Sequence, residues 1–458
     1  MDAVERAGQA NEARRAAAGL SAEDVVAVAM TWVDNSGVTR VKCVPVARLE
    51  HAAQWGIGAS PVFDTFLVDD SLVSGRFAGG PVGDLRLHPD LRRLTVLAGQ
   101  PGWAWAPADR YDQDGNPHPQ DTRALARREA ERLAAQGYTV RAAFEVEWCV
   151  SAGTGDDFEP ACHGPAYGMT RVVELSGYLR DVLEALTAEG VPVEQIHPEY
   201  AAGQFEVSVA AEDPVGAADT VVLVRETIRA VSAAHGLRVT FAPKVLADGV
   251  GNGGHVHLSL WRDGVNTMTG GTGPYGLTAA GESFVGGILS RLPALLAIGA
   301  PAVASYLRLI PSHWAGAFAC WGRENREAAV RFVSGTAGNR ADEANVEVKC
   351  FDAAGNPYLV VAALLCAGRA GLGEAATLPE PIEVDPASLP PAQLEALGIA
   401  ALPSTLAESV AAMEEEPALT EAFGEEMIDT LVAVRRGEIA LLEGADPAEI
   451  AARTRWRY

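Results

Sequence analysis

The sequence predicts an α+β fold in two domains, and three observations support this. Apolar runs at residues 25–30 and 38–46 flank the polar residues 34–37, which is the pattern of a β-hairpin with a short turn. Residues 140–150 form an apolar run in which glutamates occur at alternate positions, as in a strand. Helix-length segments such as residues 217–235 end at a glycine. Both strands and helices are therefore expected.

A change in composition divides the two predicted domains. Residues 1–105 are expected to form a small α+β domain, in which a loop at residues 56–70 carries Asp64. Residues 106–458 are expected to form the larger second domain. Residues 107–119 are rich in Asp, Gly and Pro and are interpreted as the linker. The first domain is expected to contain a helix at 4–19, the hairpin, and strands at 85–87 and 94–97.

The second domain is expected to combine several helices with strands and to end in acidic helices. Asp121 is a suitable N-cap for its first helix, and glycines follow two of the later ones. Helices are expected at residues 122–135, 174–189, 217–235, 281–300 and 357–372, and strands at 140–150, 204–210 and 239–243.

The composition argues against several classes of protein. The formal net charge is −24 at pH 7 and no basic stripe occurs, which argues against a nucleic-acid partner. The longest uncharged run, residues 292–307, is interrupted by Pro293 and Pro301 and is too short to span a bilayer. The N-terminus has no apolar core flanked by basic residues, so no signal peptide is expected.

The six cysteines indicate a reducing compartment. They form no Cys-x-x-Cys pair and lie in apolar runs, so each is expected to be a buried thiol. A cytoplasmic location follows from this expectation. The cysteines are Cys43, Cys149, Cys162, Cys320, Cys350 and Cys366.

A glycine-rich segment with two histidines, residues 251–260, is the centre of the predicted site. His255 and His257 are two residues apart on an expected strand, so both side chains point to the same face. The glycines before them allow another group to approach the backbone closely. This pattern alone is a moderate signal for a metal or a nucleotide.

Three acidic strands can face these histidines. A charged side chain in an apolar strand is unfavourable unless it is paired or bound to a metal, whereas a lone glutamate more often faces solvent. One histidine with five glutamates can hold two hard divalent cations. The five glutamates are Glu145, Glu147, Glu199, Glu206 and Glu347.

Basic residues near these strands indicate an anionic ligand. Arg308 lies in an apolar run and needs an anionic partner, which a buried structural ion pair could also provide. Residues 322–331 carry three arginines suited to polyphosphate charge, although such a run on a helix is normally solvated. Glu347 and Lys349 alternate with valines and share one face of their strand.

Six motifs in this order resemble the type I glutamine synthetases. The resemblance covers nearly the whole chain, including the N-terminal hairpin. The motifs are Glu145-x-Glu147, Glu199 with Gly203-Gln204-x-Glu206, Gly254-His255-x-His257-x-Ser259, Arg308-Leu309-Ile310-Pro311, Asn325-Arg326 with Arg331, and Glu347-Val348-Lys349 with Asn356-Pro357-Tyr358.

The resemblance implies a fold, a reaction and an assembly. The fold is an N-terminal β-grasp domain with a catalytic domain built on a curved antiparallel sheet flanked by helices. The reaction forms γ-glutamyl phosphate from glutamate and ATP, after which an amine displaces the phosphate. Two Mg²⁺ or Mn²⁺ ions are implied in each site. Twelve subunits in two rings of six, with active sites between neighbouring subunits, are also implied.

The resemblance assigns roles to the metal and nucleotide residues. One metal touches glutamate and the phosphate, and the other orients the ATP phosphates. The arginines neutralise the transferring phosphoryl group, whose negative charge is spread over its oxygens. The resemblance assigns Glu147, Glu199 and Glu206 to the first metal and Glu145, His255 and Glu347 to the second. It assigns Arg326 and Arg331 to the phosphoryl group, and His257 and Ser259 to the nucleotide.

The resemblance also assigns the substrate residues. Arg308 would bind the α-carboxylate of glutamate, and Gly251 and Asn252 would contact the same substrate. Asp64 matches the aspartate that binds ammonium and helps to remove its proton. Lys349 stands where the family has an arginine at the γ-carboxylate, so it retains the charge without the bidentate fork.

Other departures from the family pattern concern the amine and the regulation. Trp314 stands three residues after Pro311, where the family has a glutamate that closes over the site and helps to bind ammonium. Asn345 replaces an arginine near the nucleotide. Residues 381–391 contain no tyrosine, which argues against control by adenylylation.

These observations predict an ATP-dependent ligase that couples glutamate to an organic amine. An ordinary glutamine synthetase that tolerates Trp314 is the first alternative. A catalytically silent homologue is the second, but a scaffold has no need of five buried glutamates around a histidine. The sequence leaves the identity of the amine open.

Overall fold

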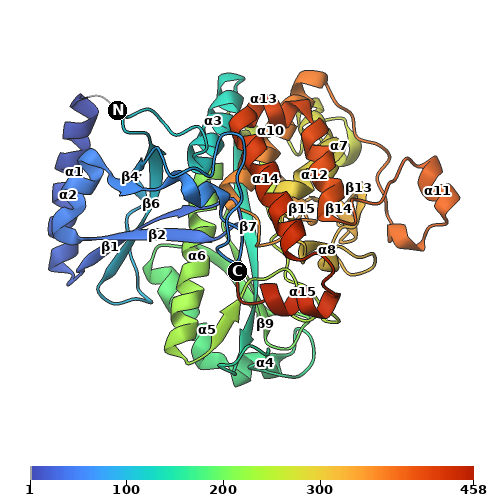
Figure 1. The fold of residues 1–458 in the computed structure, drawn as a ribbon. Helices are drawn as coiled ribbons and strands as arrows, with labels where there is room; N and C mark the ends of the chain where they lie inside the picture. The colour runs from blue at the N-terminus through green and yellow to red at the C-terminus, as the bar shows by residue number, and fades with distance from the viewer. Residues whose placement is uncertain (1–2) are drawn as a thin grey trace.

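Two β-sheets determine the architecture of the computed structural model, which describes residues 3–458 (Figure 1). The first sheet has the strand order β2-β1-β6-β4-β3, and β5 pairs with β6. Its strands are β1 (Ala27–Val33), β2 (Thr39–Pro45), β3 (Ile57–Ala59), β4 (Leu85–Pro89), β5 (Thr95–Val96) and β6 (Trp103–Tyr111).

The N-terminal unit packs two helices against the first sheet. The predicted hairpin is confirmed, because β1 and β2 pair antiparallel around the turn at residues 34–38. β1 also pairs parallel with β6, which brings the start and the end of the unit together. The helices α1 (Ala3–Ala22) and α2 (Leu49–Trp55) contact each other and cover an apolar core that includes Met30 and Leu49.

The predicted linker is wrong over its first residues. β6 continues to Tyr111 and pairs with β4, so residues 107–111 belong to the first sheet. The predicted boundary at residue 105 therefore lies inside a strand. Backbone pairing carries the strand past its single proline, because residues 108–111 pair with β4 and Pro107 lies opposite Thr31 of β1.

The second sheet is curved into a half-barrel and flanked by helices (Figure 1). Its strand order is β13-β14-β15-β11-β7-β9-β8, with β10 on β7 and β12 on β11. The predicted antiparallel pairing is confirmed except at one edge, where β13 and β14 are parallel. The strands are β7 (Tyr138–Ser151), β8 (Val193–Pro198), β9 (Gln204–Val209), β10 (Arg238–Thr240), β11 (Val256–Arg262), β12 (Val265–Asn266), β13 (Phe318–Arg323), β14 (Ala328–Val333) and β15 (Asn345–Val348).

Helices cover this sheet and continue to the C-terminus. α6 packs on β7, and α10 packs against α7 and α3. In Figure 1, α11 projects from the side of the molecule. The helices are α3 (Thr122–Ala135), α4 (Met169–Glu174), α5 (Ser176–Ala188), α6 (Pro214–Ala234), α7 (Ala279–Gly299), α8 (Ser305–Arg308), α9 (Arg340–Glu343), α10 (Pro357–Glu374), α11 (Pro391–Ala396), α12 (Leu406–Glu415), α13 (Pro417–Phe423), α14 (Glu425–Leu441) and α15 (Pro447–Thr454).

The helix α7 has the length and apolarity of a membrane span. It packs against α10 and α12, and most of its residues are buried inside the protein. Because its neighbours in the fold cover its apolar surface, α7 is best explained as a core helix.

The cysteines follow the prediction with one exception. All six are free thiols in the described part of the chain, and five are buried. Cys43 is exposed, because it lies in β2, at the edge of the first sheet.

The turn of the β1–β2 hairpin joins the two units. The Asn356 side chain donates hydrogen bonds to the backbone oxygens of Val33 and Asp34, at 3.0 and 3.1 Å. Arg435 donates to the backbone oxygen of Asn35 at 2.6 Å. Gly37 has φ +81°, and an added Cβ would lie only 1.9 Å from the backbone oxygen of Ala354.

Candidate active site

Strand pairing brings the predicted acidic residues to one face of the second sheet. Glu147 on β7 lies opposite Glu206 on β9, and Glu206 lies opposite His197 on β8. On the other side of β7, His257 on β11 lies opposite Glu347 on β15. Because directly opposed residues point to the same face, each row gathers its polar side chains into one space.

The first cluster consists of Glu145, His255 and Glu347. His255 Nδ1 lies 2.9 Å from Glu145 Oε2 and 3.2 Å from Glu347 Oε1. One ligand atom from each residue lies within 4.8 Å of the others. This cluster corresponds to the ligand set that the resemblance implied for the ATP-orienting metal.

The second cluster differs from its prediction by one residue. His197, Glu199 and Glu206 place their ligand atoms within 4.8 Å of one another. Glu147 lies opposite Glu206 of this group, and its Oε1 is 4.0 Å from Nε2 of His255 in the first cluster. The Gln204 side chain donates to Glu147 Oε2 at 3.1 Å. Glu147 therefore lies between the clusters, and His197 is a candidate ligand that was not predicted.

The donor set fits divalent cations. Mg²⁺ and Mn²⁺ prefer carboxylate oxygens, and the imidazoles here are compatible with Mn²⁺. Burial raises the pKa of Glu206 to about 7, because the hydrogen bond with His197 only partly offsets the desolvation and nearby carboxylates raise it further. Burial also raises the pKa of Glu147. Bound cations would relieve this concentration of buried negative charge.

A cavity of about 740 Å³ connects the two clusters with basic and aromatic side chains. It extends from the carboxylates to Trp314 at its partly exposed end. Its other lining residues include Tyr167, Tyr200, Lys244, Gly251, Arg308, Arg326, Arg331 and Lys349.

Arg308 is placed to bind a carboxylate in this cavity. It is 6% exposed, and its Nη2 donates to the backbone oxygen of Lys349 at 2.9 Å. Its Nη1 is buried and has no hydrogen-bond partner among residues 3–458. A buried guanidinium with a free donor is a strong recognition group for an acidic substrate. Lys349 instead donates to Glu347, at 3.0 Å.

The three clustered arginines separate in the structure. They lie around a turn between β13 and β14 instead of on a helix. Arg326 is exposed and lines the cavity, whereas Arg323 lies over the ring of Tyr275, 4.8 Å from its centre. Arg331 also lines the cavity and forms ion pairs with Glu324 and Glu347, both at 3.0 Å.

A second cavity of about 760 Å³ lies next to the first cluster. Glu145 and His257 line both cavities, and Ser259 and Asn345 line this one. His257 Nδ1 lies 2.8 Å from Asn345 Oδ1, and its Nε2 lies 3.1 Å from Glu145 Oε1. Burial lowers the pKa of His257, but Glu145 outweighs this effect and raises it to about 9.

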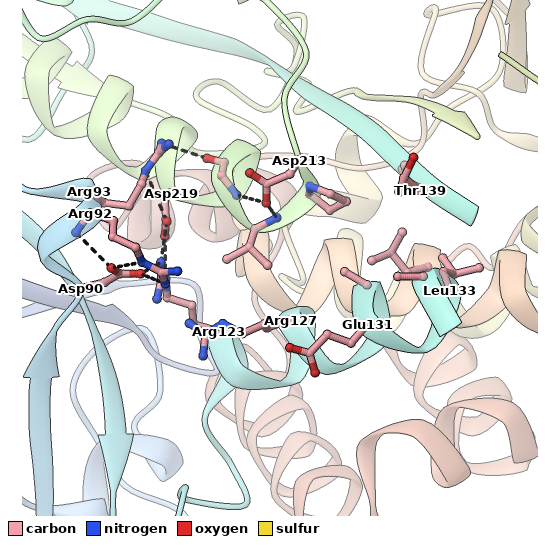
Figure 2. Close-up of a pocket in the computed structure, with 17 residues that line it drawn as sticks. Asp90, Arg92, Arg93, Arg123, Arg127, Glu131, Leu133, Thr139, Asp213 and Asp219 are labelled. Atoms are coloured by element: carbon pink, nitrogen blue, oxygen red, sulfur yellow. Dashed lines mark hydrogen bonds and ion pairs between the residues drawn. The ribbon is translucent and has the colours of Figure 1, made fainter. Parts of the chain in front are cut away.

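A third cavity of about 500 Å³ lies away from these clusters, between η3 (Leu91–Arg93), α3 and α6 (Figure 2). The arginines that line it all form ion pairs with carboxylates. Arg92 bonds Asp90 at 2.7 Å and Arg123 bonds Asp219 at 2.8 Å. We assign no chemistry to this cavity, because its arginines are already paired.

A protein-family model supplies the deciding comparison. Residues 119–451 match the model described as "Glutamine synthetase, catalytic domain". The chain belongs to the glutamine synthetase family. The predicted glutamine synthetase-type ligase is thereby confirmed, and enzymes of this family use ATP and divalent metals.

The relatives of this glutamine synthetase-type chain include enzymes with different names. It is 57% identical to "Gamma-glutamylpolyamine synthetase GlnA3" of Streptomyces coelicolor, over 99% of this chain and 98% of that protein. It is 31% identical to "Glutamine synthetase" of Pyrococcus horikoshii, over 87% of this chain and 86% of that protein.

Two solved structures of similar proteins share the fold. One, described as a novel glutamine synthase homolog, covers 95% of this chain and 99% of its own, with 33% identity and a TM-score of 0.85. The other, described as a GmaS/ADP complex, covers 94% of this chain and 96% of its own, with 26% identity and a TM-score of 0.80.

Two residues that the resemblance assigned to the substrates, Asn252 and Asp64, line neither of these two cavities. Asn252 is fully buried, and its amide donates to the backbone oxygen of Ala242 while its Oδ1 accepts from Gln204. Its predicted substrate contact is therefore not supported. It instead holds Gln204, which in turn orients Glu147.

Asp64 is the other residue outside the cavities. Its side chain is 2% exposed, and its two oxygens bond Arg110 at 2.5 Å and His118 at 2.9 Å. Burial would raise its pKa, but Arg110 and His118 outweigh burial and lower it. Within one chain Asp64 is an ion-pair anchor of the N-terminal unit. Its predicted role as a base concerns the active site of the neighbouring subunit and stays a prediction.

Several glutamine synthetase site residues were missed from the sequence. His197 and Glu199 have the same two-residue spacing as His255 and His257, so strand alternation could have identified His197. Lys244 is a single charge in an apolar run, which is a signal that could have identified it. Two further missed residues, Tyr167 and Tyr200, come from loops, where no periodic pattern marks them.

Aromatic rings line the partly exposed end of the glutamine synthetase-type cavity. Tyr200 and Trp314 are stacked, with 4.5 Å between ring centres and 18° between ring planes. Tyr167 stacks on His197 at 5.3 Å and donates a hydrogen bond to Glu199 at 2.5 Å. The end of the cavity predicted to receive the amine therefore combines apolar rings with a carboxylate.

Proposed function

We propose that this enzyme uses ATP to join the γ-carboxylate of glutamate to an amino group of a polyamine. The observation that carries the proposal is the stack of Trp314 on Tyr200, at the position where the family pattern has an ammonium-binding glutamate. The name of the relative with 57% identity, a gamma-glutamylpolyamine synthetase, supports it.

Cavity residues have the chemistry to bind both ends of glutamate. Arg308 Nη1 offers a free buried donor for the α-carboxylate. Lys349 supplies positive charge near the γ-carboxylate, and Arg326 and Arg331 lie where a phosphoryl group can be neutralised. A γ-carboxylate oxygen takes the terminal phosphoryl group of ATP and releases ADP. The amine nitrogen then bonds to the acyl carbon, loses a proton and displaces phosphate.

Two divalent cations complete this proposal. Glu145, His255 and Glu347 would hold one, and Glu199, Glu206 and His197, with Glu147 beside them, would hold the other. When bound, Mg²⁺ or Mn²⁺ would neutralise phosphate charge and polarise phosphoryl oxygens. The solved GmaS/ADP complex, which has the same fold, supports nucleotide binding by this chain.

The acceptor end of the cavity suits an alkylammonium better than ammonium. A small ammonium ion needs a compact set of anionic oxygens, which the indole of Trp314 cannot supply. Aromatic faces attract an alkylammonium by about 0.5–2 kcal/mol, and the same rings pack against its methylene groups. The chain's net charge of −24 is also compatible with a cationic substrate.

Phosphate release tests this proposal directly. We expect a higher kcat/KM with putrescine or spermidine than with ammonium, at fixed glutamate and ATP. Trp314→Glu should move the preference towards ammonium, because it restores a carboxylate and removes the apolar ring. If the wild-type enzyme prefers ammonium and Trp314→Glu leaves the ratio unchanged, the enzyme is an ordinary glutamine synthetase.

A double ring of twelve subunits and a cytoplasmic location complete the proposal. Free cysteines throughout the described residues agree with a reducing compartment. Light scattering should give about twelve times the 48.0 kDa chain mass, as the family resemblance implies. A fully active monomer would contradict the ring.

A further inference from the structure

Tyr200 reaches the acceptor end of the cavity from a loop. The residue lies between β8 and β9, directly after the candidate metal ligand Glu199. Trp314 comes from the segment between α8 and β13. Tyr200 is 41% exposed and Trp314 is 42% exposed, and both line the cavity. Two large rings that remain this exposed contribute little to the core of the described chain and leave apolar surface for a ligand.

The backbone of each ring is held in place. Arg171 on α4 donates hydrogen bonds to the backbone oxygens of Glu199 and Tyr200, at 2.5 and 3.2 Å. Trp314 has φ +53°, in the left-handed region, and its N–H donates to Glu327 at 2.8 Å. A bulky residue in this region is costly and persists only where its surroundings hold it. The stack is therefore a prearranged surface.

A third ring extends this surface to the buried carboxylates. Tyr167 meets Tyr200 edge to face, with 5.5 Å between ring centres and 84° between planes. The Tyr167 hydroxyl then bonds Glu199. The wall runs from Trp314 through Tyr200 and Tyr167 to Glu199, so one side of the cavity changes from apolar to anionic along its length.

We propose that Tyr200 determines the length of amine that the enzyme accepts. This inference rests on the proposed polyamine ligase and adds the residue that selects the chain length. The Tyr200–Trp314 stack packs against the methylene groups of the acceptor and attracts its distal ammonium, while the reacting nitrogen lies deeper, near Glu199. The preferred acceptor is then a primary amine with several methylene groups and a second cationic nitrogen.

Amine kinetics with putrescine, spermidine and ethylamine test this inference. We expect Tyr200→Ala to lower kcat/KM for putrescine and spermidine by about 2- to 30-fold, the range that corresponds to one cation–π contact. The change should appear mainly in KM for the amine. Ethylamine has no distal ammonium, so the substitution should lower kcat/KM for ethylamine by a smaller factor. The KM for glutamate should stay at its wild-type value.

Further variants separate recognition from a structural role. Tyr200→Phe keeps the ring and should keep the wild-type ratio of spermidine to ethylamine. Trp314→Ala should add little to the loss already caused by Tyr200→Ala, because the two rings act as one unit. Phe77→Ala removes another exposed ring, which lies outside the cavity, and serves as the matched control.

The outcomes distinguish this inference from the proposed function. If wild-type enzyme uses polyamines but Tyr200→Ala lowers kcat/KM equally for all three amines, the inference is overturned and the polyamine function remains. An unchanged spermidine to ethylamine ratio also overturns it. If the wild-type enzyme prefers ammonium to every polyamine, the proposed function itself fails.

Discussion

Glu147 lies directly opposite Glu206 across the β7–β9 pair. Like charges at opposed positions destabilise a sheet, and a divalent cation nearby would reverse this effect. We expect Mg²⁺ or Mn²⁺ to raise the melting temperature, with a stabilisation of about 2.7 kcal/mol at one hundred times Kd. Scanning calorimetry with and without metal measures it.

Glu147→Gln should make the metal-free protein more stable and reduce the gain on adding metal. Glu12→Gln on the exposed surface of α1 is the matched control. An equal metal-induced gain in wild type and Glu147→Gln would show that Glu147 is not part of a metal site.

Arg308 is expected to control glutamate affinity. Its free Nη1 is a donor for the α-carboxylate, and a hydrogen bond between charged groups contributes about 1.5–3 kcal/mol. Arg308→Gln should therefore raise KM for glutamate by about 10- to 100-fold. Initial rates at saturating ATP measure this change. Arg323→Gln is the control, because Arg323 lies outside the cavity, and a similar rise there would refute the assignment.

Arg171 is expected to act as a positioning residue. Besides Glu199 and Tyr200, it donates to the backbone oxygens of Gly164 and Ala201. Lysine lacks the planar fork, so Arg171→Lys should lose about 1–3 kcal/mol of stability. Urea unfolding measures this loss.

The same variant should also lower kcat/KM for spermidine more than for ethylamine, because the Tyr200 backbone loses a support. A loss of stability with no change in the ratio of the two amines would assign Arg171 a purely structural role.

The raised pKa of the buried Asp34 carboxyl predicts that stability depends on pH. Burial raises its pKa from 3.8 to about 6, although Arg40 lies 2.6 Å away. The folded chain therefore holds this proton more tightly than the unfolded chain. The resulting stabilisation is complete below about pH 4 and is lost as the pH rises through about 6.

Asp34→Asn should remove this dependence. Asparagine stays neutral at every pH. The free energy of unfolding of the variant, relative to that of wild type, should therefore increase by on the order of 3 kcal/mol between about pH 4 and pH 7. Urea unfolding at several pH values measures this difference. A difference that stays constant with pH would contradict the raised pKa.

The sequence predicted those parts of the fold and site that depend on periodicity. Alternation placed Glu145 with Glu147, and Glu347 with Lys349, on the inner faces of their strands. The structure places Glu145, Glu147 and Lys349 in one cavity, and buried Glu347 accepts a hydrogen bond from Lys349 beside it. The linker was wrong over residues 107–111 because pairing with β4, which no local pattern marks, extends β6 to Tyr111.

Residues whose positions depend on tertiary contacts were harder to predict. Asn252 follows a glycine in the central motif, but its amide turns inward to satisfy buried polar groups. The ring of Tyr200 meets Trp314, more than one hundred positions later in the chain, and no local pattern encodes that contact. Asp64 matched a motif, whereas its burial beside Arg110 depends on the folding of the whole N-terminal unit.

The hairpin turn held by Asn356 and Arg435 limits how this enzyme can be recombined. Asn356 bonds the backbone of Val33 across 323 positions of the chain, and Gly37 leaves no space for a side chain beneath Ala354. A chimera that took only its N-terminal unit from a distant homologue would place a foreign hairpin turn against Asn356, Arg435 and Ala354. The contacts between the turn and these residues would then no longer match. The hairpin turn and the residues that contact it must therefore be exchanged together, although they are encoded in distant parts of the gene.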